Sequence, residues 1–304
     1  MSIRFDDRVV IVTGAGNGLG RCHASAFAAR GAKVVVNDLG GTGEGQGADM
    51  SVAARVASEI RSAGGEAIAN TDPVQQGQRI VEQALDEFGR IDVLVNNAGI
   101  LRDAAFHKMD QAQWDAIYET HLLGSFRTTH AAWTAMRAAG YGRIIMTSSA
   151  AGLYGNFGQA NYAAAKMGLV GLAYTLAVEG GTRDILTNVI APVAASRLTA
   201  SVMPPEVLER IQPEYVTPLV LKLCHENHKG NGEIFEVGGG WISAVRLEQS
   251  VGKTFELNDI SPEGIDACWN EITDFTNANH RKDVTATMVE IGERIGVSFG
   301  MAKQ

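Results

Sequence analysis

The stretch that decides the fold is Val9-Val10-Ile11-Val12-Thr13-Gly14-Ala15-Gly16-Asn17-Gly18-Leu19-Gly20. Its run of β-branched residues predicts a buried strand, and the glycines that follow predict a sharp turn into a helix that opens near Arg21. A helix that starts beyond such a turn presents free backbone N–H groups and the positive end of its dipole. Because glycines let the backbone approach a pyrophosphate closely, the stretch favours a dinucleotide site.

The spacing of these glycines is Thr-Gly-x-x-x-Gly-x-Gly and not the ordinary Gly-x-Gly-x-x-Gly. A tight turn without any ligand is the alternative interpretation of such a run. From the turn we predict the following cofactor-binding residues: Gly14, Asn17, Gly18, Leu19 and Gly20.

Short Val- and Ile-rich runs alternate with longer stretches of helical spacing along the rest of the chain. The predicted strands are Val9–Val12, Lys33–Asn37, Val93–Asn96, Arg143–Thr147 and Leu186–Ile190. The predicted helices are Arg21–Arg30, Ala53–Ala63, Gln78–Phe88, Trp114–Ala138 and Tyr162–Glu179. This alternation predicts an α/β fold with a doubly wound parallel sheet of the Rossmann type, in three layers.

We expect one domain with a C-terminal extension. Residues 1–240 are predicted to form the dinucleotide-binding domain, because glycine and β-branched density falls after Gly238-Gly239-Gly240. Residues 241–304 are predicted to form the extension, packed near the mouth of the substrate site. Within it, Ser261-Pro262-Glu263 is typical of a helix start, with serine as the N-cap and proline at the first helical position.

An acidic residue follows the second predicted strand at the place where a ribose would lie. Asp38 comes 18 residues after Gly20, which is close to the spacing of the acid that holds the adenosine ribose. A carboxylate accepts hydrogen bonds from ribose hydroxyls but repels a 2′-phosphate, so we predict NAD and not NADP as the cofactor. Capping of a helix is the alternative role for Asp38.

Two further runs lie at predicted strand ends, where open α/β sheets bind their ligands. Thr71-Asp72-Pro73-Val74 places Asp72 and Val74 near the adenine, and Asn96-Asn97-Ala98-Gly99 places Asn97, Ala98 and Gly99 along the nucleotide. Either run is also compatible with a simple turn. The glycine-rich run from Leu39 to Gly47 lacks the Gly-Lys-Ser/Thr of a phosphate-binding loop, and we predict a flexible loop there.

The candidate catalytic residues are Ser149, Tyr162 and Lys166. Tyr162 and Lys166 are four residues apart, so they share one face of a helix. Tyrosine has an ordinary pKa near 10, and a cation roughly 4 Å away at an effective dielectric of about 20 stabilises tyrosinate by roughly 4 kcal/mol before desolvation. This pair predicts that Tyr162 takes a hydroxyl proton while Ser149 holds the substrate oxygen, both residues acting beside the cofactor.

Composition narrows the partners to small molecules. A formal net charge of −8 and a pI near 5.4 argue against binding nucleic acid or anionic membranes.

Three widely spaced cysteines form no disulfide framework. The run His225-Glu226-Asn227-His228 is one residue short of the zinc-binding pattern His-Glu-x-x-His, so we expect no metal. The chain ends in Ala302-Lys303-Gln304, which is not a peroxisomal address, so we expect a cytoplasmic protein.

The run from Ala163 to Val178 is apolar almost throughout, although a helix that lies on one sheet should keep a polar outer face. We therefore predict a homodimer or homotetramer in which a second subunit covers this helix. Coverage by the C-terminal extension is the alternative.

In their order and spacing, the glycine turn, Asp38, Asn96–Gly99, Ser149 and Tyr162/Lys166 resemble those of the short-chain dehydrogenase family. This resemblance implies an NAD-dependent enzyme that oxidises a secondary alcohol, with Tyr162 and Lys166 also contacting the cofactor. Within the family, the resemblance is strongest to the (3R)-hydroxyacyl-CoA dehydrogenase domains of type 2 multifunctional enzymes. That likeness implies oxidation of a (3R)-3-hydroxyacyl-CoA to the 3-ketoacyl-CoA.

Two departures from the family pattern affect the predicted site. His121 stands where the family usually has a catalytic Asn, so we name it as a catalytic candidate with a packing role as the alternative. The segment Pro192–Thr199 keeps the expected Pro and Thr over the nicotinamide but lacks the usual Pro-Gly, and from it the resemblance adds Pro192, Ala195 and Thr199 to the cofactor-binding residues. A 17β-hydroxysteroid-type dehydrogenase acting on a free steroid and a non-enzymatic NAD-sensing module are the alternative functions.

Overall fold

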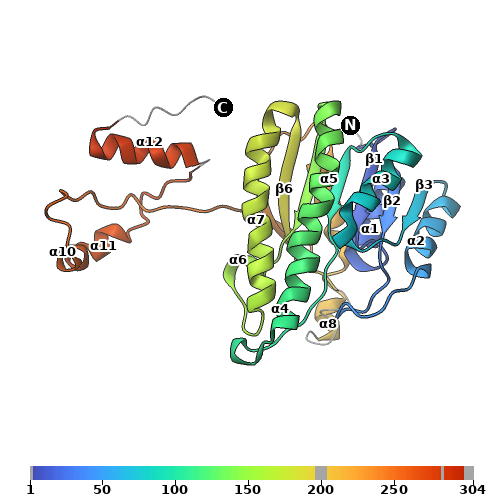
Figure 1. Ribbon diagram of the computed structural model, residues 1–304, viewed down its shortest axis with the longest axis horizontal. Coiled ribbons are helices and arrows are strands. Elements are labelled where there is room, and N and C mark those ends of the chain that lie inside the picture. Colours follow the sequence, from blue (N-terminus) through green and yellow to red (C-terminus); the bar gives the residue numbers. More distant parts are fainter. Residues whose placement is uncertain (1–2, 196–203, 282–283, 298–304) are drawn as a thin grey trace. The chain divides into compact units, whose positions relative to one another are not determined.

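In the part of the chain that the structure describes, eight strands form one sheet in the order β3-β2-β1-β4-β5-β6-β7-β8. Figure 1 shows β3 at one end of this sheet, beside β2. The computed structural model describes residues 3–195, 204–281 and 284–297. Every registered pairing from β3 to β7 is parallel, which confirms the predicted doubly wound sheet. The strands are β1 Val9–Thr13, β2 Lys33–Asn37, β3 Glu66–Asn70, β4 Val93–Asn96, β5 Gly142–Thr147, β6 Ile185–Pro192, β7 Ile234–Gly238 and β8 Trp241–Val245.

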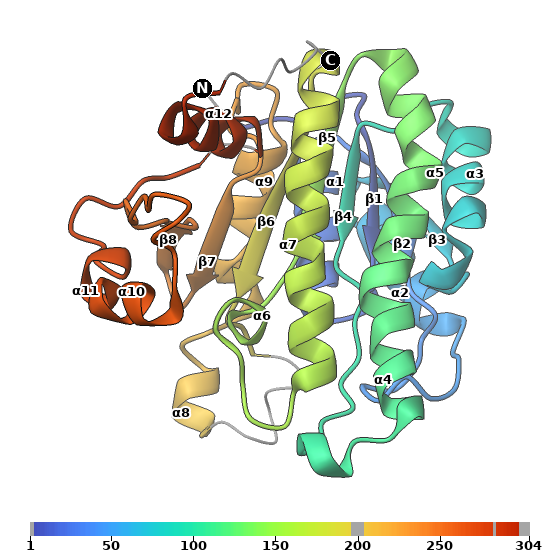
Figure 2. The same cartoon turned by 60° about the vertical axis from the view of Figure 1, so that its left-hand side comes forward.

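Helices cover both faces of this sheet, so the fold has the three predicted layers (Figure 2). One face carries α1 Gly18–Ala28, α2 Ser51–Ser62 and α9 Thr217–Cys224, and the other carries α3 Gly77–Phe88, α5 Gly124–Ala139 and α7 Ala160–Gly180. The remaining α-helices of the described residues are α4 Gln111–Ile117, α6 Ala150–Tyr154, α8 Pro205–Leu208, α10 Pro262–Ala267, α11 Trp269–Ile272 and α12 Val284–Ile295. Strands covered on both sides are apolar over most of their length, as the wholly buried β1 and β4 show.

The strand order reverses between β1 and β4. After β1 the chain moves outward through β2 to β3, and it then returns to place β4 on the other side of β1. In open α/β sheets such a reversal leaves a crevice at the carboxyl ends of the two strands. The glycine turn after β1 and the Asn97 segment after β4 therefore face the same crevice.

The long helix predicted for Trp114–Ala138 is interrupted in the structure. Between α4 and α5 the chain makes a π-helical turn from Tyr118 to Leu123. Such turns insert one extra residue into a helix and occur often at functional sites. His121 lies within this turn, and its ring is buried.

Three strands escaped the sequence analysis. β3 reads Glu-Ala-Ile-Ala-Asn and is the edge strand, so its sequence lacks the continuous apolar run on which the other predictions rested. β7 and β8 lie at the opposite end of the sheet, and several of their side chains are partly or fully exposed. Half-buried strands give a weaker pattern than central parallel strands.

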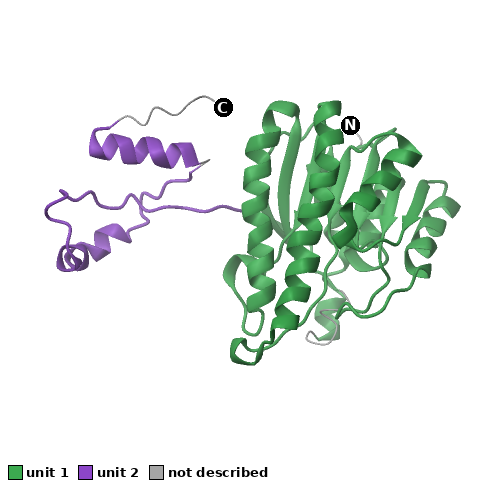
Figure 3. Cartoon of the chain, viewed as in Figure 1, with its two compact units in different colours: residues 1–244 green, residues 245–304 purple. Residues whose placement is uncertain are grey.

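The chain divides into two compact units, Met1–Ala244 and Val245–Gln304 (Figure 3). The sequence analysis placed its boundary between residues 240 and 241, before β8. In the second unit, the Ser261 side chain caps α10 by accepting a hydrogen bond from Gly264 N at 3.0 Å, as its sequence predicts. That this unit packs near the substrate mouth stays a prediction. No helix in the described parts of the chain is long and apolar enough to cross a bilayer.

Candidate active site

The glycine turn after β1 has no room for side chains at two of its positions. Gly14 adopts a φ of +64°, and a Cβ on it would lie 2.7 Å from Ala98 Cα. A Cβ on Gly20 would clash with Gly14 O, which lies on the other arm of the turn. Only glycine fits both positions, and the compact turn that results is the shape that a pyrophosphate requires.

Asn97 fastens this turn to the end of β4. Its side-chain amide donates hydrogen bonds to Thr13 O at 2.9 Å and to Gly14 O at 3.1 Å. The Thr13 hydroxyl accepts from the backbone N–H groups of Asn97 and Ala98 in return. The floor of the crevice is thus a network between two strand ends that are far apart in sequence.

Asp38 lies beside the glycine turn. Its two carboxylate oxygens accept hydrogen bonds from Gly16 N and from Gly40 N, each at 2.7 Å. The charge is therefore held in place at the side of the crevice where the sequence analysis expects the ribose. The residues agree with a dinucleotide here, because the glycines leave space for a backbone-bound phosphate and the carboxylate matches ribose hydroxyls.

One pocket of about 880 Å³ runs from Asp38 to Ser149. It is lined by most of the predicted cofactor-binding residues, which are Gly14, Asn17, Gly18, Leu19, Gly20, Asp38, Asp72, Val74, Asn97, Ala98, Gly99, Tyr162, Lys166 and Pro192. Ala195 is not among the lining residues, and its backbone N donates to Ile211 O at 2.6 Å. Thr199 lies outside the described residues.

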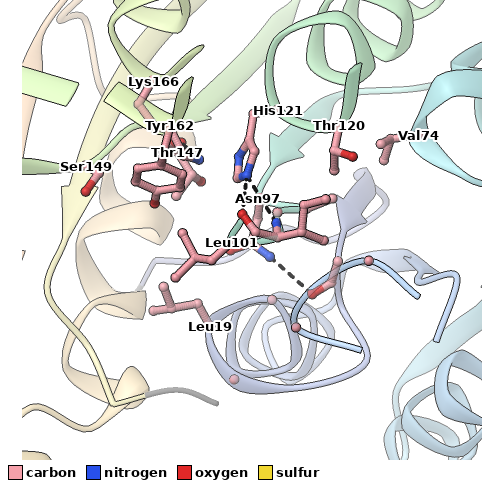
Figure 4. A pocket seen from close by; sticks show the side chains of 18 of the residues that line it. Leu19, Val74, Asn97, Leu101, Thr120, His121, Thr147, Ser149, Tyr162 and Lys166 are labelled. Carbon is pink, nitrogen blue, oxygen red and sulfur yellow. Dashed lines mark hydrogen bonds between the residues drawn. The ribbon is translucent and has the colours of Figure 1, made fainter. Parts of the chain in front are cut away.

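The candidate catalytic residues Ser149, Tyr162 and Lys166 lie close together in the pocket (Figure 4). They are at the end of β5 and on α7, and β5 is three strands along the sheet from β2, which Asp38 follows. Ser149 follows β5, and its hydroxyl caps α6 by accepting from Ala151 N at 3.2 Å. Tyr162 and Lys166 lie one turn apart on α7, with the Lys166 Nζ atom 5.5 Å from the centre of the Tyr162 ring. Lys166 Nζ also donates to Thr147 O at 2.6 Å, so the end of β5 orients the ammonium.

Burial dominates the electrostatics of this group. It raises the pKa of Tyr162, and a hydrogen bond with Ser149 acts against that shift. It lowers the pKa of Lys166 to about 7. From the sequence we expected the neighbouring ammonium to lower the pKa of the tyrosine, whereas in the structure desolvation of the phenol is the largest influence and raises that pKa.

His121 connects Tyr162 with the segment after β4. Its Nε2 atom lies 2.8 Å from Ile100 O and 3.1 Å from Ile100 N, and its ring stands edge-on to Tyr162 at 5.2 Å between centroids. Burial, assisted by the charge of Lys166, lowers the pKa of His121 well below its ordinary value. These contacts agree with the packing alternative, and the catalytic role of His121 stays a prediction.

Sequence reasoning missed part of the pocket wall. The segment Leu101-Arg102-Asp103 and the loop residues Gly41, Thr42, Gly43 and Gly45 also line the pocket. The available signal was the position of Leu101–Asp103, which begins one residue after the Asn96–Gly99 run.

A sequence profile described as short chain dehydrogenase matches residues 8–204. The chain belongs to the short-chain dehydrogenase family. The predicted family is thereby confirmed, and the eight-stranded sheet and the pocket beyond the glycine turn are those of one of its members.

Individual relatives within the family are similar over most of this chain. Peroxisomal multifunctional enzyme A of Dictyostelium discoideum is 55% identical, over 92% of this chain and 63% of the relative. The peroxisomal hydratase-dehydrogenase-epimerase of Saccharomyces cerevisiae is 51% identical, over 92% of this chain and 32% of the relative. The chain therefore spans between about a third and two thirds of the length of these family members.

Two solved structures of the family resemble this one. Full-length peroxisomal multifunctional enzyme type 2 from Drosophila melanogaster superposes with a TM-score of 0.82 at 40% identity, over 96% of this chain and 50% of that chain. A 7α-hydroxysteroid dehydrogenase in complex with NADH superposes with a TM-score of 0.70 at 29% identity, over 78% of this chain and 95% of that chain. The fold and this NADH complex support binding of NAD(H) by the present family member.

The expected cytoplasmic location is wrong. It rested on the three terminal residues, whereas relatives at 51–55% identity are named as peroxisomal enzymes.

Lys166 offers a pH test of the buried site. Its pKa is about 7 in the folded protein and 10.5 when exposed, so the cost of the buried ammonium is complete below pH 7 and is relieved as the pH rises toward 10.5. Relative to Lys166→Met, the free energy of unfolding of the wild type is expected to rise by about 2 kcal/mol between pH 7 and pH 9. Urea denaturation at a series of pH values measures this difference.

The exposed Lys108→Met variant is the matched control, and its difference from the wild type is expected to stay constant with pH. A constant difference for Lys166→Met as well would show that the ammonium is not buried in solution.

Proposed function

We propose that this chain is an NAD-dependent dehydrogenase that oxidises a (3R)-3-hydroxyacyl-CoA to the 3-ketoacyl-CoA. The observation that carries the proposal is the meeting of Ser149, Tyr162 and Lys166 at one end of a pocket whose other end holds Asp38. The substrate class rests on the likeness to the hydratase-dehydrogenase-epimerases and multifunctional enzymes. A small-molecule substrate agrees with the pocket volume of about 880 Å³, which is far too small for a macromolecule.

In this proposal each catalytic side chain has one task. The Ser149 hydroxyl donates a hydrogen bond to the oxygen of the substrate, and the Tyr162 phenol, as phenolate, takes the hydroxyl proton. Lys166 supplies the positive charge that favours the phenolate, and Thr147 O holds its ammonium in place. Bound NAD supplies the acceptor for the hydride. His121 acts as a positioning residue, because its ring packs against Tyr162.

Asp38 supports the preference for NAD over NADP. Its carboxylate is fixed by Gly16 N and Gly40 N beside the glycine turn, where the 2′-hydroxyl of the adenosine ribose would be recognised. A 2′-phosphate would meet this negative charge at close range. The cationic residues among those lining the pocket are Arg102 and Lys166, and Lys166 lies at the catalytic end.

A substrate panel tests the proposed reaction. The protein is offered (3R)- and (3S)-3-hydroxyacyl-CoAs of several chain lengths and free hydroxysteroids, each with NAD and with NADP, and reduced cofactor is measured. Turnover is expected with the (3R) thioesters and NAD, and at least about tenfold less with NADP because Asp38 repels the 2′-phosphate. Turnover of free steroids alone would favour the steroid dehydrogenase, and turnover of none of these compounds would contradict the proposal.

Tyr162→Phe separates an enzyme from an NAD-sensing module. The variant keeps the ring that packs on His121 but loses the proton acceptor, so kcat is expected to fall about 10³-fold while NADH affinity is retained. Steady-state kinetics and NADH fluorescence titration measure the two effects. Tyr174→Phe on the same helix is the control, and it should turn over normally. Undiminished turnover by Tyr162→Phe would rule out the proposed mechanism.

We also propose assembly as a homodimer or homotetramer through α7. This helix buries Leu169 and Val170 against the sheet, yet Met167 and Val178 on it are 38% and 63% exposed. Val178→Asp is expected to shift the sedimentation coefficient to that of a monomer, because a charge there opposes burial against a second copy. Met50→Asp, at an exposed residue outside α7, should leave it unchanged. A monomeric wild type would exclude this assembly.

A further inference from the structure

The segment from Gly40 to Asp49, which we call the strap, forms one wall of the pocket. It follows Asp38 directly, and the sequence analysis expected a flexible loop there. Its glycines carry no side chains, so its main chain lies against the space that the dinucleotide would fill. Apart from Gly40, whose N–H holds the Asp38 carboxylate, the strap has no role in the function proposed above.

The base of the strap is closed by hydrogen bonds. Gly40 N donates to Asp38 Oδ1 at 2.7 Å, and Asp49 N donates to Leu39 O at 3.0 Å. A Cβ on Gly40 would lie 2.6 Å from Asp49 N, so the two ends of the strap touch. Within the strap, Thr42 N donates to Gln46 O at 2.9 Å.

The tip of the strap is fastened to the segment after β4. Leu101 N donates to Gly43 O at 2.9 Å, and the Arg102 side chain donates from Nε to Glu44 O at 3.0 Å. Gly45 adopts a φ of +77°, and a Cβ on it would lie 2.8 Å from Ile100 Cδ1. The strap therefore bridges the carboxyl ends of β2 and β4, which flank the glycine turn after β1.

The segment after β4 is also hydrogen-bonded to the start of α7. Asn161 donates from Nδ2 to Arg102 O at 3.0 Å, and its Oδ1 accepts from Tyr162 N at 2.8 Å. Gln159 donates to Asp103 Oδ2 at 2.7 Å. The main chain of Arg102 is fixed by its hydrogen bond with Asn161 of α7. The hydrogen bond from the Arg102 side chain therefore ties the strap to a fixed position.

We propose that the strap retains the bound dinucleotide and that Arg102 is the positioning residue that keeps it closed. This inference rests on the NAD binding of the proposed function. A covering loop must open before its ligand can leave, so each bond that fastens the loop slows release. Arg102 supplies a charged donor, whose hydrogen bonds are the stronger kind, and it reaches a main-chain oxygen on the strap.

Release of NADH tests the role of Arg102 without any substrate. Arg102→Met keeps the aliphatic stem and removes the donor, and NADH is expected to dissociate about tenfold faster, as judged by stopped-flow displacement fluorescence. The KM for NAD should rise by a similar factor. Arg102→Lys, which restores a donor, should recover part of the loss. Glu44→Ala is the matched control, because Arg102 bonds to the main-chain oxygen of Glu44 and this variant keeps that oxygen.

Gly45→Ala tests the strap from its other side. The added methyl group would push against Ile100, so NADH release should again accelerate. Combined with Arg102→Met, its effect should be less than multiplicative, because both changes open one strap. Circular dichroism shows whether each variant folds, and Gly45→Ala carries the test if Arg102→Met does not fold.

The outcomes separate this inference from the proposed function. A wild type that fails to bind NADH would contradict both. A wild type that binds NADH, with a folded Arg102→Met or Gly45→Ala variant that releases it at the wild-type rate, would overturn the strap alone. Faster release in Glu44→Ala would show that the side chain of Glu44, and not Arg102, fastens the loop.

Discussion

The side-chain amide of Asn97 fixes the part of the pocket that is formed by the glycine turn. It joins the ends of two strands whose neighbourhood exists only because the chain crosses back over the sheet at this point. The glycine turn has almost no spare volume, since methyl groups at Gly14 and Gly20 would collide with main-chain atoms. A turn so tightly packed has one arrangement, and the bonds from Asn97 to Thr13 O and Gly14 O hold it.

The chemistry at the other end of the pocket depends on burial. The sequence placed Tyr162 and Lys166 on one helical face, and the structure agrees, because the spacing of four residues leaves little freedom. Their electrostatics did not follow from that spacing. How far desolvation raises the pKa of the phenol depends on surroundings contributed by distant segments, among them the ring of His121. The spacing of residues along a helix does not indicate how strongly a side chain is desolvated in the folded protein.

The contrast between local sequence patterns and contacts from distant segments also explains which parts of the fold could be predicted. Central strands such as β1 are buried on both faces, so they can be recognised in the sequence as apolar runs. The edge strand β3 has no such run. The π-helical turn from Tyr118 to Leu123 was missed, because α-helices lie on both sides of it and the prediction joined them into one long helix. The contacts of the strap were equally hidden, because main-chain oxygens of Gly43 and Glu44 make them and these atoms occur in every residue.

The strand order has a consequence for folding during synthesis on the ribosome. One half of the sheet, from the edge strand β3 to β4, is complete in the nascent chain when residue 96 emerges. The free side of β4 then offers unpaired N–H and C=O groups until β5, ending at Thr147, is synthesised and pairs with it. During that interval the nascent chain exposes an unpaired, apolar strand edge, to which a chaperone can bind.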